Sequence, residues 1–173
     1  MDAEQSSAPV SVRWFSWGLV VVRVVMGAFF LMEAVHQITS GYIGGDDLAV
    51  KLQKALDNND ILPPYEYFLE HVALKIDDPL TVLVIVGEVA VGVGLMLGLV
   101  TRLTAAVAVF MNVNFLLMNG PDPGSGGIDA VFIVGEIVLF AFAARQAVSA
   151  DRVLARMGVS VSLMSGAVEQ RVA

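Results

Sequence analysis

Four stretches of the chain are apolar over enough residues to cross a lipid bilayer, and this feature most limits what the chain can fold into. The stretches run over residues 17–38, 80–100, 103–118 and 128–144. A helix that rises 1.5 Å per residue needs about 20 residues to cross a hydrocarbon core of roughly 30 Å. Of the 173 residues, 57% are hydrophobic, and the mean hydropathy is +0.75. We therefore predict one all-α domain over residues 1–173, an integral membrane four-helix bundle.

The segments between the spans indicate an orientation. The connection over residues 41–79 holds eight acidic residues against three lysines. Its apolar residues recur at helical spacing, which predicts two short amphipathic helices that cap the bundle on the outer surface. Arginines gather in the segments that share the other side, including the tail over residues 145–173: Arg13, Arg102, Arg145, Arg152, Arg156 and Arg171. Because positive residues mark the cytoplasmic side, we expect a multi-pass protein of the cytoplasmic membrane with both termini in the cytoplasm.

Composition excludes several classes of function. The net charge of -7 argues against a nucleic-acid partner and leaves the lipid bilayer as the expected environment. The chain has no cysteine, which excludes disulfides, cysteine-ligated iron–sulfur clusters, c-type haem and thiol redox chemistry. Residues 1–16 carry no cluster of positive charge, so we expect the first apolar run to remain in the protein rather than to be removed as a signal peptide.

Polar residues inside the predicted spans are the candidate functional residues. An ionisable group in hydrocarbon is costly unless it faces protein or water, so each such group marks a candidate site. We expect catalytic roles for four of them: His36 or Glu33 would hydrogen-bond an oxygen of the bound ligand, and Glu88 and Glu136 would exchange protons. Helical spacing places further polar side chains on the same inner faces, where we expect them to bind a ligand: His36, Asn112, Asn119 and Asp129.

Structural interpretations of the same residues remain open. Asn112 and Asn119 are also expected in plain hydrogen bonds between helices, and Gly94 and Gly98 form a GxxxG pattern typical of close helix packing. Glu33 and His36 have the Glu-x-x-His spacing of di-iron proteins, but such sites need two pairs and further carboxylates, so we predict no metal. A haem would need both histidines of the chain, His36 and His71, and we expect none.

Several short motifs resemble those of the DoxX/DoxD family of membrane proteins. Residues 87–102 read GEVAVGVGLMLGLVTR, which resembles the second span of that family. Further likeness lies in the segment from Arg23 to Phe30, in residues 64–69, in the run MNVNF over residues 111–115, and in residues 144–154. The resemblance, to the DoxD type in particular, implies a four-helix membrane protein linked to respiratory chemistry. Members include the quinone-reducing subunit of thiosulfate:quinone oxidoreductase.

The pattern and the resemblance together lead to a functional expectation. We expect a polar pocket in the outer half of the bilayer that binds a quinone, with aromatic and methionine walls: Phe29, Phe30, Met32, Phe115, Met118 and Phe132. The electrons would come from a redox partner subunit. Two alternatives stay open: a non-catalytic accessory or assembly subunit of a membrane complex, and a small proton-coupled transporter. A homo-oligomer is compatible with either.

Overall fold

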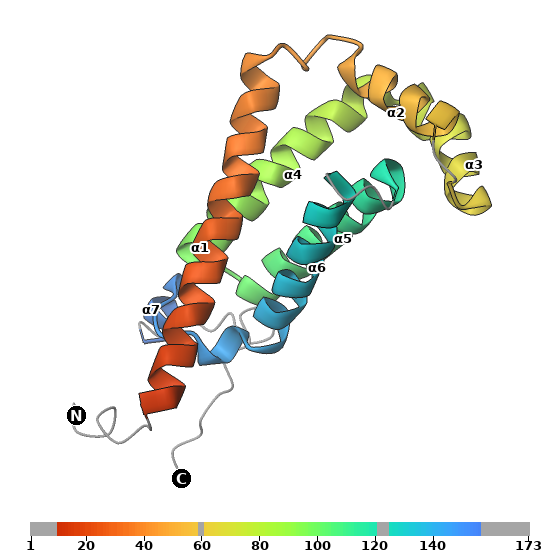
Figure 1. Ribbon diagram of the computed structural model, residues 1–173. Helices are drawn as coiled ribbons and strands as arrows, with labels where there is room; N and C mark the ends of the chain where they lie inside the picture. The colour runs from red at the N-terminus through yellow and green to blue at the C-terminus, as the bar shows by residue number, and fades with distance from the viewer. Residues whose placement is uncertain (1–9, 59–60, 121–124, 157–173) are drawn as a thin grey trace.

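The computed structural model describes residues 10–58, 61–120 and 125–156, and every regular element in these ranges is a helix (Figure 1). This confirms the predicted all-α membrane bundle. Three helices are long and apolar enough to cross a membrane: α1, α4 and α5. The elements in chain order are α1 (Val10–Thr39), α2 (Asp47–Asn58), α3 (Pro63–His71), η2 (Ala73–Lys75), α4 (Asp77–Leu97), α5 (Thr101–Asn119), α6 (Ser125–Ala141), η3 (Ala143–Arg145) and α7 (Ala150–Arg156).

The fourth apolar run forms α6, whose 17 residues are at the lower limit for a transmembrane helix. The sequence predicts this helix over residues 128–144, but it begins and ends three residues earlier. It ends early because Phe142 leaves the α-helical region, with φ -110° and ψ 19°, and the chain then makes the short 3-10 helix η3. The helices formed by the first and third apolar runs are longer than predicted. The run over residues 17–38 forms Val10–Thr39, and the run over residues 103–118 forms Thr101–Asn119.

Both ends of α4 lie three residues before the predicted ends of the second run. The helix begins at Asp77 because Pro79 falls in its first turn, where a missing N–H is tolerated. It ends at Leu97 because Gly98 adopts φ +69°, a left-handed conformation that glycine accepts at little cost. The Gly98 and Leu99 N–H groups both donate to the Gly94 carbonyl, at 2.9 Å each. A tight turn therefore leads from α4 into α5.

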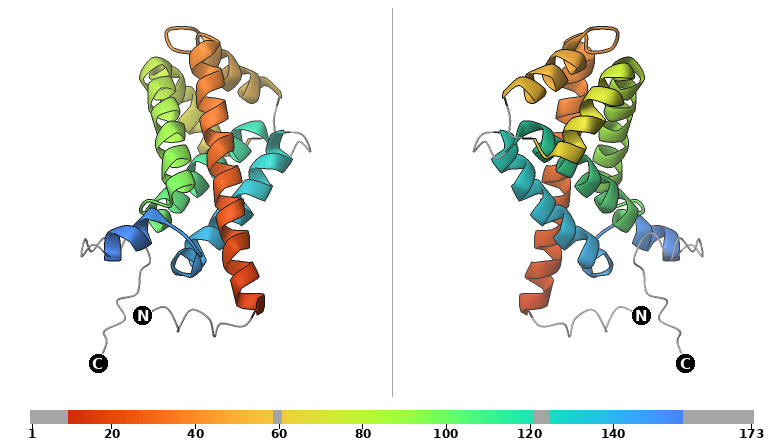
Figure 2. Two further views of the ribbon diagram at one scale, coloured as in Figure 1. Left: turned by 90° about the vertical axis from the view of Figure 1, so that its left-hand side faces the viewer. Right: turned by 90° about the vertical axis from the view of Figure 1, so that its right-hand side faces the viewer.

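The four long helices form two tightly packed pairs. α1 packs along α4, and α5 packs along α6, while α4 and α5 join the pairs at the turn (Figure 2). α1 and α4 approach closely at Gly27 and Gly92: a Cβ on Gly27 would lie 2.8 Å from the Gly92 carbonyl oxygen. Contact between α1 and α6 is much more limited. The bundle is therefore tight within each pair and looser where α1 crosses α6.

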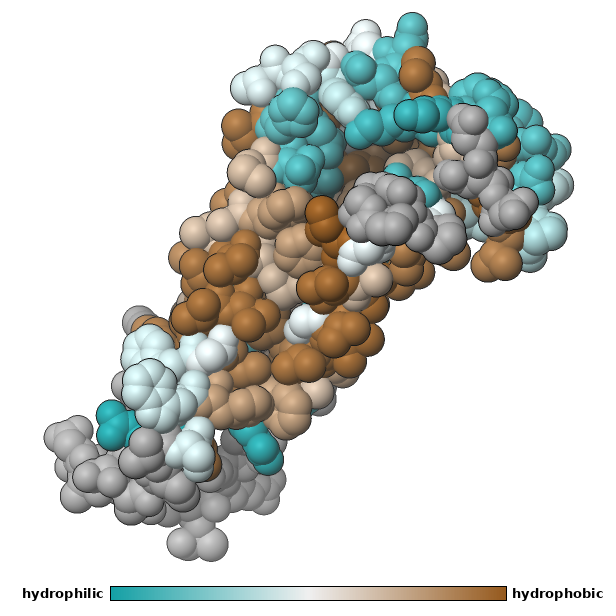
Figure 3. Space-filling view, in the orientation of Figure 1, coloured by the Kyte–Doolittle hydropathy of each residue, from teal (hydrophilic) through white to brown (hydrophobic). Residues whose placement is uncertain are grey.

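Helices α2, α3 and η2 form a cap at the end of the bundle opposite the α4–α5 turn (Figure 1). Its core consists of Leu52, Leu69 and Ala73, and residues of α4 and α5 pack against it. The sequence predicts a second cap helix whose apolar residues run on to Ile76, but α3 ends at His71. Of these apolar residues Leu69 is buried, and the others are exposed: Phe68, Val72 and Ile76. Figure 3 shows polar residues gathered over this cap and apolar residues over the middle of the bundle.

Candidate functional site

Glu88 is held between the two helices of the first pair. It lies on α4, is 2% exposed, and accepts hydrogen bonds from the Gln37 side-chain amide at both oxygens, at 2.9 Å each. Glu33 of α1 and Lys51 of α2 lie within electrostatic range of the Glu88 carboxylate. The Lys51 ammonium also sits 4.9 Å from the centre of the Tyr42 ring. We call Glu33, Gln37, Lys51 and Glu88 the cap-side cluster.

His36 does not join this cluster. Its side chain is exposed, and its Nδ1 lies 3.4 Å from the Ser40 hydroxyl. The prediction that His36 lines an inner pocket is therefore wrong for this structure. The buried face of α1 runs through Phe30 and Ala34 to Gln37, and residue 36 lies about 200° around the helix from residue 34. Gln37 takes the predicted place of His36.

Glu136 and Asn112 meet between the helices of the second pair. Glu136 on α6 is fully buried, and its Oε1 accepts a hydrogen bond of 2.6 Å from the Asn112 amide on α5. The other oxygen, Oε2, is buried without a hydrogen-bond partner among the described residues. Two turns closer to the cap, the Asn119 amide donates to Asp129 at 3.0 Å. We call these four residues the α5–α6 ladder.

The predicted polar residues thus form two clusters, one in each helix pair. Glu88 contacts α1, whereas Glu136 contacts α5, so each carboxylate belongs to a different helix pair. The ladder consists of four predicted residues that form two hydrogen-bonded pairs between α5 and α6. The two helices run in opposite directions, and the residues are seven apart on each helix, so the pairs lie two helical turns apart. Sequence reasoning missed Gln37, although its position three residues after Ala34 extends the apolar face of α1 and could have identified it.

The predicted aromatic walls are only partly assembled. Phe30 is buried, and its ring and the Phe29 ring both lie against Phe132 of α6, with ring centres 6.5 Å and 4.9 Å apart respectively. Met32 is 57% exposed on the outer face of α1, which corrects its predicted place in the wall. Phe115 and Met118 are half-buried. A shallow groove of about 240 Å³ lies between α5 and α6 and is apolar throughout, lined by Ala106, Val109, Ile137 and Phe140.

A third polar group, which we call the Arg23 junction, lies at the α4–α5 turn. Arg23 of α1 is 3% exposed, and its guanidinium donates to the Gln146 side-chain oxygen. Pairing with a neighbour, rather than extension to the surface, therefore accommodates this charge. A Cβ on Gly98 would overlap the guanidinium, so the junction also requires glycine at that position.

Asp151, in the first turn of α7, completes the junction. One carboxylate oxygen accepts the Val100 N–H at 2.7 Å, and the other accepts the Thr101 N–H and hydroxyl, each at 3.0 Å. Val100 has φ +46°, an unusual conformation for a β-branched residue, and the bond to Asp151 helps to hold it. The carboxylate satisfies free N–H groups at the start of α5 and lies within electrostatic range of Arg23.

Tyr65 joins the cap to the bundle. Its hydroxyl donates a hydrogen bond of 3.0 Å to the Asn114 backbone carbonyl of α5. Burial raises the pKa of the Tyr65 hydroxyl above its ordinary value, so the group remains a hydrogen-bond donor at neutral pH. This bond fixes α3 over the cap end of α5.

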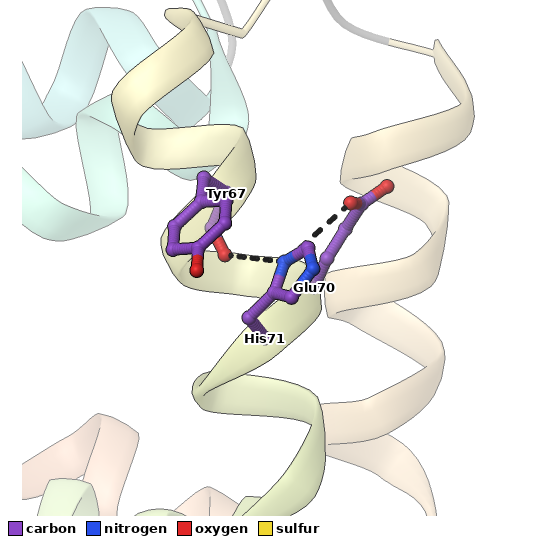
Figure 4. Close-up of polar contacts among 3 residues, drawn as sticks. All are labelled: Tyr67, Glu70 and His71. Carbon is purple, nitrogen blue, oxygen red and sulfur yellow. Dashed lines mark hydrogen bonds and ion pairs between the residues drawn. The ribbon is translucent and has the colours of Figure 1, made fainter.

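The second histidine lies on the exposed surface of the cap. His71 stacks on the Tyr67 ring with centres 4.2 Å apart, and its Nδ1 lies 3.1 Å from the Tyr67 carbonyl oxygen (Figure 4). The same nitrogen is 3.8 Å from a Glu70 carboxylate oxygen. These contacts stay within one helix turn and account for the position of His71 without a ligand.

Comparison with known proteins identifies the family. No curated protein and no solved structure is significantly similar to the chain. The DoxX family model matches residues 18–119, which include α1 from Gly18 onward, the cap, α4 and α5. The match holds more than half of the sequence, including Arg23, Glu88 and Asn112, whereas Glu136 and Asp151 lie beyond it. The chain is a member of the DoxX family of membrane proteins.

Proposed function

We propose that this chain is the membrane subunit of a respiratory oxidoreductase and that Glu136 exchanges a proton with a quinone. The observation that carries the proposal is the state of the Glu136 carboxyl group: one oxygen is fixed by Asn112, and the other is buried without a partner among the described residues. A buried polar atom without a partner is costly, unless a ligand or a water completes it. Membership in DoxX, a family often linked to oxidoreductases, also supports the proposal of an oxidoreductase subunit.

In quinone reduction, this chain would need only to bind the quinone and transfer protons. Reduction of a quinone to a quinol takes up two electrons and two protons. Asn112 would orient the Glu136 carboxyl group, which would donate one proton from Oε2 to a quinone oxygen, be reprotonated, and donate the second proton in the same way. Asp129 and Asn119, on the cap side of the ladder, are the candidates for that return path. We expect a partner subunit to supply the electrons, as in the thiosulfate:quinone oxidoreductases that the sequence resembles.

The first test replaces Glu136 with leucine and measures the quinone that copurifies with the protein. We expect about a tenfold loss of bound quinone, the effect of removing one contact worth roughly 1.4 kcal/mol. Lipid extraction followed by mass spectrometry gives the quinone content per protein. His36→Ala is the control, because His36 is exposed and outside both clusters. Equal quinone content in Glu136→Leu and the parent would contradict the proposal.

An accessory subunit is the second candidate, and the cap-side cluster favours it. Both oxygens of Glu88 are occupied by Gln37, so this carboxylate is tied into the α1–α4 interface rather than open to a ligand. A protein whose buried acids only hold helices in register would need no quinone. It would lose stability but no ligand in the Glu136→Leu variant.

We also propose that both ends of the chain face the cytoplasm and that the cap faces outward. The arginines at the turn end support this orientation, since Arg102 and Arg145 lie at that end and the cap carries a net negative charge. We expect a reporter enzyme that works only after export to be inactive when fused after Ala173, and active when inserted at Gly44 in the α1–α2 connection. An active reporter at Ala173 would show that the C-terminal end faces outward and would contradict the proposed orientation.

A further inference from the structure

The contact between α1 and α6, which we call the seam, differs from the other helix contacts in the bundle. It consists of the Phe29 and Phe30 rings against Phe132 and of the Met26 side chain against Gly135. Just after the end of α6, the Phe15 ring also packs against Phe142. No hydrogen bond joins α1 to α6 among the described side chains, whereas the α1–α4 and α5–α6 contacts each hold a buried carboxylate bond. Figure 2 shows α1 crossing α6 at a steep angle rather than running along it.

The seam lies within one helix turn of Glu136 on α6. Phe132 and Glu136 are four residues apart on α6, so their side chains are neighbours on one helix face. A helical side chain leans toward the start of its helix, which brings the Glu136 carboxyl group toward Phe132. The Phe30 ring is buried, whereas the Phe29 and Phe132 rings are half-buried. Two half-buried rings in contact with each other therefore lie between α1 and α6, one of them a single helix turn from Glu136.

Both helices that form the seam expose apolar side chains on their outer surfaces. Val25 and Met32 of α1 are 60% and 57% exposed, and Val131 and Val134 of α6 are 74% and 64% exposed. Because these side chains belong to the membrane-embedded part of the bundle, they face lipid rather than water. A molecule that reaches the seam must therefore already be dissolved in the bilayer.

We propose that the seam is a lateral entrance through which a quinone with an apolar tail passes from the bilayer to Glu136. The inference rests on the proposed function and deepens it by defining the substrate as a membrane-dissolved quinone rather than a water-soluble one. The head group enters as the Phe29 and Phe132 rings move apart, and the tail stays in lipid. The rings and the Met26 thioether have the rotamer freedom that such opening needs, unlike the backbone contact at Gly27.

The test closes the seam with a reversible cross-link. The chain has no cysteine, so Met26→Cys with Gly135→Cys introduces the only thiols. A Cβ on Gly135 would lie 3.1 Å from the Met26 sulfur, and shortening Met26 makes room for it. A short bifunctional methanethiosulfonate reagent joins the two cysteines, and a reductant releases them. The probe is deuterated decylubiquinone in proteoliposomes, and its uptake by the protein is followed by mass spectrometry.

A chemically matched pair in another interface provides the control. Gly87 of α4 faces Met111 of α5 in the same way, with a Cβ on Gly87 3.2 Å from the Met111 sulfur. We expect the seam cross-link to slow uptake at least tenfold and the reductant to restore it, whereas the Gly87→Cys with Met111→Cys cross-link leaves uptake unchanged. Equal uptake in the two cross-linked proteins would overturn the entrance. No uptake by the unmodified protein would instead overturn the proposed function, and the entrance with it.

A second variant keeps the entrance testable if the cysteine pair does not assemble. Phe132→Ala removes the ring that contacts both Phe29 and Phe30, so we expect faster uptake of the same probe. Phe140→Ala, on the lipid-facing side of α6, is the control and should leave the rate unchanged. Slower or equal uptake in Phe132→Ala would count against a gate formed by these rings.

Discussion

Valine in place of Gly27 is expected to separate α1 from α4 and to destabilise the whole bundle. The added Cβ would lie 2.8 Å from the Gly92 carbonyl oxygen and 2.9 Å from the Met96 backbone nitrogen. Backbone atoms of a packed helix cannot move aside as a flexible side chain can, so the helices must shift. We expect a loss of about 3 kcal/mol, the upper part of the usual range for overpacking, and an apparent melting temperature lower by about 10 °C.

The control for this prediction lies on the same helix. A Cβ on Gly18 has no atom within 4 Å, so Gly18→Val adds the same side chain to α1 without a clash. Thermal unfolding in detergent compares the two variants with the parent, and size-exclusion chromatography measures the fraction that remains folded after heating. Similar melting temperatures for Gly27→Val and Gly18→Val would mean that the close approach of α1 and α4 does not hold in the protein.

Much of the fold could be predicted because hydrophobic length is a strong signal in a membrane protein. The apolar runs identify α1, α4, α5 and α6, and helical spacing identifies the two helices of the cap. Helix ends were harder, since they depend on local backbone chemistry. Pro79 allows α4 to start before the apolar run, and Gly98 ends it within the run.

The candidate site could be predicted only in part. Rarity in hydrocarbon singles out Glu88, Glu136 and Asn112 whatever their neighbours, and all three are buried. The partner of each carboxylate depends on helix rotation, which the sequence defines to within about one residue. A neutral amide such as Gln37 does not stand out in an apolar helix. The ionisable residue beside it in the sequence, His36, does stand out but is exposed.

Contacts between distant segments could not be predicted at all. The partner of Arg23 lies 123 residues later, in a segment whose place in the fold depends on the turns after α6. The sequence shows a charge inside the first apolar run, which can reach the surface or pair with another residue, but it does not show which residue that is. The same limit applies to Asp151, whose likeness to the family motif gave no role for the side chain.

Alanine in place of Asp151 is expected to destabilise the turn end of the bundle strongly. The change removes three hydrogen bonds from the start of α5 and takes away the negative charge near buried Arg23. Loss of a helix cap and of a buried counter-charge together predict a cost of about 3 kcal/mol. Thermal unfolding in detergent measures the effect, and Asp78→Ala is the control, because that acid is exposed at the start of α4.

Two further variants separate the causes of this loss. Asp151→Asn keeps one oxygen as an acceptor but removes the charge, so we expect a smaller loss of stability than for alanine. If the uncompensated charge of Arg23 accounts for much of the cost, Arg23→Leu combined with Asp151→Ala is more stable than the sum of the single effects predicts, because neither charge is then buried alone. Additive losses would show that Asp151 acts only as the cap of α5, and that Arg23 relies on Gln146 for its stabilisation.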